Sequence, residues 1–172
     1  LIEQKFGFSY AHFNRRDTNA GFLGTPVFDG STSKFDWQAN VVLYETEVIR
    51  SVLTSGLDYL DEGASSSASA RQSLHATGFY VQQHLVLDDR WSTVAGARWD
   101  RYSLAGPAKT YRVTSRYTAD ESGTAFHGSI GTGFRAPAIN ELFDPNLGNL
   151  DLKPERSFGW ELGVEQSLGG GD

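Results

Sequence analysis

The sequence predicts an all-β fold, an antiparallel transmembrane β-barrel segment of about eight meander strands. Three observations support this fold class. In eight stretches, large apolar side chains alternate at a period of two with small or polar ones. The connections between the stretches alternate between long and short, as in barrels that cross an outer membrane. The chain also contains no run of about 18 apolar residues, which excludes a transmembrane helix.

Each strand is predicted from its own alternation. In the clearest stretch, Phe35 and Trp37 share one face and Asp36 lies on the other. In the last stretch, Trp160 shares a face with other apolar residues, whereas Glu161 lies on the opposite face. In chain order, the predicted strands cover residues 2–10, 35–43, 49–60, 79–85, 91–99, 111–117, 124–134 and 158–165.

The connections predict the direction of the strands. We expect long loops at residues 14–32 and 61–71, where Asn, Asp, Gly, Ser and Ala are abundant, and again after Leu104 and Phe134. Short turns are expected near Thr46, Asp89 and Glu121. Outer-membrane barrels have short periplasmic turns and longer extracellular loops, so the first strand would run outward and the last inward.

Composition excludes several functional classes. The chain has 172 residues, a net charge of −6 and a pI near 5.2, which argues against a nucleic-acid partner. It has no cysteine, so a disulfide framework or a thiolate metal site is excluded. The mean hydropathy of −0.38 is that of an average soluble protein. In a membrane barrel, however, inward polar residues offset outward apolar ones, so this mean does not exclude a barrel.

The two faces of the strands have different predicted environments. In hydrocarbon a sheet must close on itself, with an apolar face toward lipid and a polar face toward the lumen. Aromatic residues near strand ends are typical of interfacial girdles. Periodicity alone also permits a soluble β-sandwich in which they are ordinary core or cross-strand residues. These aromatic residues are Tyr10, Tyr44, Tyr59, Trp91, Trp99 and Trp160.

Three motifs follow one another between residues 131 and 165. The first is Gly-Thr-Gly-Phe-Arg-Ala-Pro at 131–137, whose proline ends the preceding strand because it lacks a backbone donor. The second is Asn-Glu-Leu-Phe at 140–143, and the third is Gly-Asn-Leu-Asp-Leu-Lys-Pro-Glu at 148–155. A Ser-x-x-x-Glu-x-Gly pattern then begins at Ser157.

Together these motifs resemble the late-barrel signature of TonB-dependent outer-membrane receptors, which read GxGFRAP, NELY and GNPDLKPE. Phe143 replaces the usual Tyr and Leu150 the usual Pro. The motifs cover about a fifth of the chain. The residues to which the resemblance assigns a structural role are Gly131, Gly133, Phe134, Arg135, Pro137, Asn140, Glu141, Leu142, Lys153, Pro154, Glu155, Glu161 and Gly163.

The resemblance implies a barrel of about 22 strands with a plug folded inside. Residues 1–172 would all belong to that barrel domain, with the plug domain absent from this chain. We expect an excerpt of a longer protein, because Leu1 begins inside a strand pattern and the Gly-rich end lacks a terminal aromatic residue. A mature domain with a cleaved signal is the alternative.

The function implied by the resemblance is uptake of a large, scarce nutrient in a Gram-negative outer membrane. A ferric siderophore or cobalamin is favoured over haem, because residues 144–147 are similar to the NPNL of haem receptors but no His lies between Arg135 and Leu147. The implied partners are the lipid of the outer membrane, the receptor's own plug domain, the TonB complex and the nutrient. The alternative from another class is a small standalone eight-stranded barrel with a structural or adhesive role.

No catalytic group and no cofactor site is predicted. The four histidines, His12, His75, His84 and His127, are expected on four strands without metal-like spacing. Asp58, Asp61 and Glu62 form an acidic cluster that offers oxygen ligands for Ca²⁺ at an outer loop. The cluster lacks the Gly-spaced ligand pattern of a calcium loop, so a solvated acidic loop is the favoured interpretation.

The charged residues of the motif region are predicted to be structural. Arg135 is expected to anchor the loop that follows its strand, and Glu155 is a candidate partner either of Arg135 or of a plug residue. Charged residues on the polar face are candidates for pairing with a plug inside the lumen. These residues are Arg98, Asp100, Glu161 and Glu165.

Overall fold

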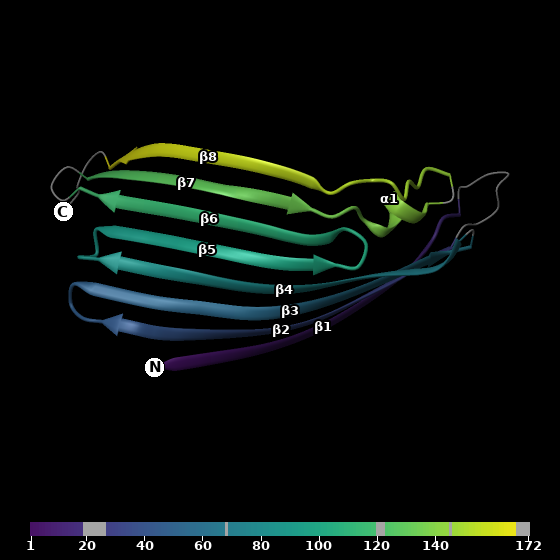
Figure 1. Ribbon diagram of the computed structural model, residues 1–172, viewed down its shortest axis with the longest axis horizontal. Helices are drawn as coiled ribbons and strands as arrows, with labels where there is room; N and C mark the ends of the chain where they lie inside the picture. The colour runs from purple at the N-terminus through teal and green to yellow at the C-terminus, as the bar shows by residue number, and fades with distance from the viewer. Residues whose placement is uncertain (19–26, 68, 120–122, 145, 168–172) are drawn as a thin grey trace.

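The computed structural model describes residues 1–18, 27–67, 69–119, 123–144 and 146–167. Within them the chain forms eight β-strands and one short helix, α1, at Ile139–Phe143 (Figure 1). The strands are β1 (Ile2–Arg16), β2 (Val27–Glu45), β3 (Ile49–Ser66), β4 (Ser69–Leu87), β5 (Trp91–Tyr102), β6 (Gly106–Thr118), β7 (Thr124–Arg135) and β8 (Glu155–Gln166).

All eight strands belong to one sheet, in which each strand pairs with its neighbours along the sequence. Every pairing is antiparallel. The predicted all-β antiparallel meander is therefore confirmed. No helix in the described residues is both long enough and apolar enough to cross a bilayer.

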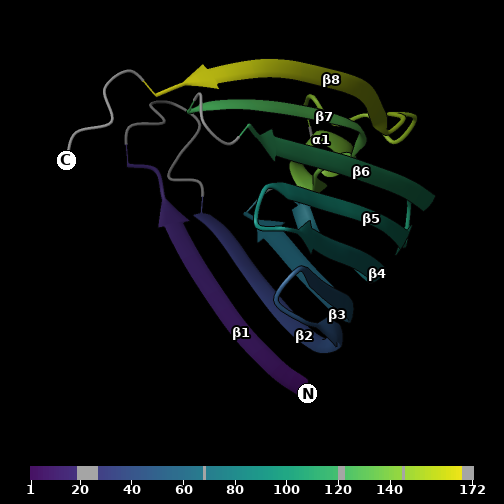
Figure 2. The ribbon, with the colours of Figure 1, turned by 90° about the vertical axis from the view of Figure 1, so that its left-hand side faces the viewer.

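The sheet is strongly curved but open. Viewed along the strands it forms an arc, with β1 and β8 at its two ends (Figure 2). β1 pairs only with β2, and β8 only with β7, within the described residues. The complete closure required by a standalone eight-stranded barrel is thus not found in the described part of the chain.

One face of the sheet is rich in exposed aromatic residues, and we call it the aromatic face. Its members align across strands because the ladder register pairs them directly. Phe6 and Leu162 are 71% and 78% exposed, so neither is part of a dry core. One aligned row on this face consists of Phe6, Trp37, Leu57, Phe79 and Trp99, and another of Trp91, Tyr117, Phe126 and Val164.

The opposite face, which we call the polar face, is the concave one. α1 follows β7 yet contacts β4, three strands away, and the shorter path between them crosses the inside of the arc. Side chains converge on a concave surface, which accounts for the buried position of Asp100, only 5% exposed. Ala108 and Ala125 are also buried on this face.

Parts of two predicted loops are strand. Residues 61–71 were expected to form an exposed loop, but β3 continues to Ser66 and β4 starts at Ser69. Likewise, β1 and β2 extend to Arg16 and Val27, well into the predicted loop at 14–32, of which residues 19–26 lie outside the described part. Small and polar residues are poor strand predictors, yet the backbone ladder of the neighbouring strands continues through them.

The connection after Leu104 is also shorter than expected. β5 and β6 pair as far as Tyr102 with Gly106, so only a tight turn joins them. The long connection after β7 is confirmed, as are the short turns between β2 and β3 and between β4 and β5. The predicted turn near Glu121 falls largely on residues 120–122, outside the described residues. The histidines lie on three strands rather than four, because β4 contains both His75 and His84.

Candidate functional site

The connection from β7 to β8 is held together by Arg135. Its guanidinium donates through Nη1 to Glu155 Oε1 at 2.8 Å and through Nη2 to Glu141 Oε1 at 2.5 Å. Arg135 ends β7, Glu155 begins β8, and the two residues are paired in the ladder. The predicted pairing of Arg135 with Glu155 is therefore present, and Glu141 joins it from α1.

Glu141 also fixes the start of α1. Its second oxygen, Oε2, accepts a hydrogen bond from the Ala138 N–H at 2.8 Å. This is one half of a capping box, and the other half is missing because the alanine side chain has no oxygen. The Ala138 N–H and, secondarily, the Arg135 guanidinium hold the pKa of Glu141 below its ordinary value of 4.5.

A compact turn follows the helix. Asp144 Oδ1 accepts hydrogen bonds from the N–H groups of Asn146 and Leu147, both at 2.9 Å. The Gly148 N–H donates to the Asp144 carbonyl, and the Asn149 N–H donates to the Glu141 carbonyl. A Cβ on Gly148 would lie 2.5 Å from Asp144 O and 2.8 Å from Leu142 O, so the turn requires glycine at this position.

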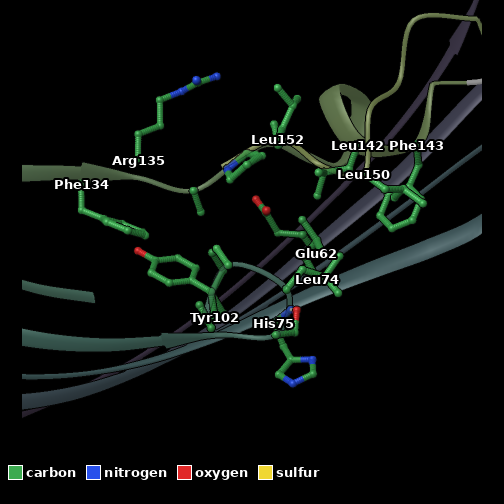
Figure 3. Close-up of a pocket in the computed structure, with 18 residues that line it drawn as sticks. Glu62, Leu74, His75, Tyr102, Phe134, Arg135, Leu142, Phe143, Leu150 and Leu152 are labelled. Atoms are coloured by element: carbon green, nitrogen blue, oxygen red, sulfur yellow. The ribbon is translucent and has the colours of Figure 1, made fainter. Parts of the chain in front are cut away.

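A largely apolar pocket of about 690 Å³ lies between this connection and the sheet (Figure 3). Phe134 and Tyr102 pack in it with ring centroids 5.2 Å apart. Leu142 of α1 is buried. The other lining residues include Leu60, Glu62, Leu74, Ala76, Pro137, Phe143, Leu150 and Leu152.

An ion cluster occupies the middle of the polar face. Arg98 on β5 donates to both carboxylate oxygens of Asp58 on β3, at 2.7 and 2.9 Å. Its Nε also donates to both oxygens of Asp100, at 2.9 and 3.0 Å. To reach Asp58 the guanidinium crosses β4 at Gly78, where a Cβ would collide with Arg98 Nη2. It also lies 5.9 Å from the ring centroid of Tyr80.

A second cluster lies near the short-turn end of the polar face. Glu165 Oε2 is 2.7 Å from Arg116 Nη1, and its Oε1 is 3.5 Å from His127 Nδ1. That nitrogen is buried without a hydrogen bond within the described residues. Glu161 is exposed on the same face of β8.

The acidic cluster considered for Ca²⁺ does not converge. Asp58, Asp61 and Glu62 all lie on β3 rather than in a loop. Asp61 points to the face opposite to Asp58, and Asp58 and Glu62 are four residues, or about 13 Å, apart along the strand. Among the described residues no group of three His, Asp or Glu side chains is placed to hold a metal ion.

The motif residues lie on β7, α1 and β8 and in the connection between β7 and β8. The structure brings Arg135, Glu141 and Glu155 into contact, and it places Phe134, Pro137 and Leu142 in the wall of one pocket. Lys153 and Pro154 lie in the connection just before β8, and Asn140 is the second residue of α1. Gly131 and Gly133 are on β7, opposite Gly159 and Ser157, and Glu161 and Gly163 are on β8.

Two features were not predicted from the sequence. Arg98 and Asp100 were expected on the polar face, but the link between Arg98 and Asp58, which is 40 residues earlier, was not. The pocket that Leu60, Leu74 and Tyr102 share with α1 was not expected either. No local pattern identifies either feature, because both depend on the register of strands that are far apart in the sequence.

These features are typical of the wall of an antiparallel membrane β-barrel. The described residues form an open arc of such a wall, with a polar concave face. Residues 2–172 match the family described as TonB dependent receptor-like, beta-barrel. The chain belongs to this family, and the resemblance carried by its motifs is confirmed at the family level.

Similar proteins agree with this assignment. The vitamin B12 transporter BtuB of Vibrio vulnificus (strain YJ016) is 31% identical over 67% of this chain and 19% of its own length. An iron-regulated outer membrane virulence protein of Vibrio cholerae (El Tor Inaba N16961) is 29% identical over 65% and 19%, respectively. This chain therefore spans about a fifth of the length of these curated relatives.

Among solved structures, the siderophore receptor PirA from Acinetobacter baumannii has the same fold. It superposes with a TM-score of 0.72 over 97% of this chain and 30% of its own chain, at 16% sequence identity. The relatives are transporters and receptors rather than enzymes, in agreement with a non-enzymatic role.

Proposed function

We propose that this chain is part of the barrel wall of an outer-membrane receptor that takes up a large, scarce nutrient with energy from TonB. A ferric siderophore or cobalamin is the proposed nutrient, ahead of haem. The printed names of the relatives, a vitamin B12 transporter and a siderophore receptor, support these two classes. The receptor's own plug and the TonB complex are the proposed partners, both outside this chain.

The observation that carries this proposal is the separation of the two faces. Trp91 and Trp99 lie on the aromatic face of β5, eight residues or about 27 Å apart along the strand. Barrel strands are tilted by about 35–45°, so this separation corresponds to about 20 Å along the membrane normal, close to the height of about 25 Å of the apolar band between the aromatic girdles. The polar face is concave, as required for a lumen that surrounds a plug. We therefore propose that the aromatic face contacts lipid in a Gram-negative outer membrane.

Charged residues of the concave face remain candidates for contact with the plug. A residue that has no partner within the wall is the better candidate. Arg98 is already bonded to both Asp58 and Asp100, so Asp100 also has its partner within the wall. Glu165 is paired with Arg116. Glu161 is exposed and has no hydrogen bond or ion pair within the described residues, so we propose it as the first of the four to test against a plug.

Uptake by the complete receptor tests this function. The receptor that contains this chain is produced in a Gram-negative strain that lacks its own cobalamin and siderophore receptors. We expect it in the outer-membrane fraction, and we expect accumulation of labelled cobalamin or of an iron-loaded siderophore that stops when TonB is deleted. Accumulation of neither nutrient, or uptake that is independent of TonB, would contradict the proposal.

A further inference from the structure

The pocket between α1 and the sheet combines mainly apolar walls with one carboxylate. Its walls are aliphatic and aromatic, with Tyr102 and Phe134 on one side and Leu142, Leu150 and Leu152 on the other (Figure 3). The carboxylate of Glu62 enters this apolar space from β3. Glu62 forms no hydrogen bond or ion pair with any residue in the described part of the chain.

No other charged side chain of the pocket neutralises this carboxylate. Arg135 lines the pocket, but its guanidinium points away from the interior and is bound to Glu141 and Glu155 (Figure 3). The His75 ring also points away from it (Figure 3). Within the described residues, the half-buried Glu62 therefore provides an unmatched negative charge in a mainly apolar pocket.

The chemistry of a fitting ligand follows from this arrangement. An anionic ligand would remove water from the Glu62 carboxylate without replacing its hydrogen bonds, which is costly. A neutral hydroxyl group would replace one of these bonds, but without an opposite charge. An ammonium group would form a charge-assisted hydrogen bond with it. The rings of Tyr102 and Phe134 would favour a cation or an aromatic body beside them.

We propose that this pocket binds a small organic cation with an apolar or aromatic body, in which Glu62 pairs with the ammonium group. This site goes beyond nutrient uptake, since neither proposed nutrient class requires a cationic group. The inference depends on the proposed function only because the complete receptor is the protein to be tested. The experiment below measures binding of a small molecule and not uptake. Binding can therefore be absent while uptake of the nutrient is present, and binding can be present while uptake is absent.

Three probes of similar shape and different charge test the site. Protonated phenethylamine, neutral phenethyl alcohol and anionic hydrocinnamate are titrated into the complete receptor in detergent, with binding followed by calorimetry. We expect phenethylamine to bind at least about tenfold more tightly than the other two. Equal binding of all three probes, or binding of none, would overturn the proposal.

Single-residue variants of the receptor test whether phenethylamine binds in this pocket. Glu62→Gln is expected to weaken phenethylamine about tenfold while leaving phenethyl alcohol unchanged, because it removes the charge and little volume. Glu47→Gln is the matched control, an exposed glutamate in the turn between β2 and β3, and it should have no effect. Ala76→Trp should abolish binding by filling the pocket. Unchanged phenethylamine binding in Glu62→Gln would refute the assignment.

Discussion

Arg98 shows how a charged side chain is accommodated inside the arc. Arg98 reaches across β4 to bond Asp58 on β3, and it also bonds Asp100 on its own strand, β5. Both carboxylates are largely buried. Removing one partner from such a cluster leaves a charge with poor solvation, which is more costly than the pair is stabilising. Gly78 matters because it leaves the space that the guanidinium crosses.

Gly78→Ala is expected to displace Arg98 from Asp58 and to destabilise the complete receptor by about 2 kcal/mol. This value lies below the range for fully buried pairs, because the Arg98 side chain is 36% exposed. Denaturant unfolding of the refolded receptor measures the change. Gly96→Ala is the control, since its Cβ would make only ordinary contacts, the nearest at 3.4 Å. Equal stability of the two variants would contradict this account.

A second residue-scale prediction concerns the turn after α1. Gly148→Ala places a Cβ against three backbone atoms of Asp144 and Leu142, which cannot move away independently. The turn should rearrange at a cost of more than about 1 kcal/mol, with loss of the bond from the Asn149 N–H to the Glu141 carbonyl. Reduced amide protection at Asn149 in hydrogen exchange would show this. Gly159→Ala, with nothing within 4 Å of its Cβ, should leave protection unchanged.

At the scale of elements, the connection between β7 and β8 depends on one carboxylate. α1 has only five residues, too few for a stable isolated helix, so its anchoring by Glu141 is expected to decide whether it forms. The pKa of Glu141 is lowered in the fold, so its stabilising contribution is complete above its ordinary value of 4.5. That contribution is lost as the pH falls through the lower, folded value.

Hydrogen exchange at α1 is therefore expected to depend on pH. In the natural protein, protection factors of residues 138–143 should be constant above the ordinary value of 4.5 and should fall as the pH is lowered below it. In Glu141→Gln, protection should be low throughout and nearly independent of pH, since no carboxylate remains to titrate. Glu47→Gln, in a distant turn, should retain the natural profile. A persistent pH dependence in Glu141→Gln would assign the effect to another group.

The sheet elements were predictable to different degrees. Large alternating side chains identified the centre of every strand, and Pro137 indicated the end of β7. The ends of β1 to β4 were not identified, because Ser, Ala, Gly and Asp fill them, notably at 61–71. These residues have weak strand propensity but gain backbone hydrogen bonds from a neighbour already in register. The anchor between Arg135 and Glu155 was predictable, because both residues flank one connection.

At the scale of the whole molecule, the two unpaired edges of the sheet decide whether the chain can fold by itself in a membrane. β1 and β8, of 15 and 12 residues, each leave one row of backbone donors and acceptors unpaired within the described chain. In a bilayer each such group costs several kcal/mol. The edges are therefore suited to pairing with further strands of a larger barrel.

The isolated 172-residue chain is expected not to refold in detergent into a protease-resistant monomer. Electrophoresis of unheated samples in SDS and resistance to trypsin measure whether a folded barrel has formed. The complete receptor, refolded in parallel, is the control. A monomeric, protease-resistant barrel formed by this chain alone would contradict the prediction, and it would revive the standalone-barrel alternative.

The sequence by itself determined the strand centres, the two chemically distinct faces and the family, because period-two alternation and contiguous motifs are local properties of the chain. Only the tertiary structure decided which distant residues meet, such as Asp58 with Arg98, or Glu62 with the walls contributed by Tyr102 and Leu142. The physical reason is register, since a shift of one residue between strands would reverse the face of every side chain. That register is set jointly by the pairing of all eight strands and their curvature.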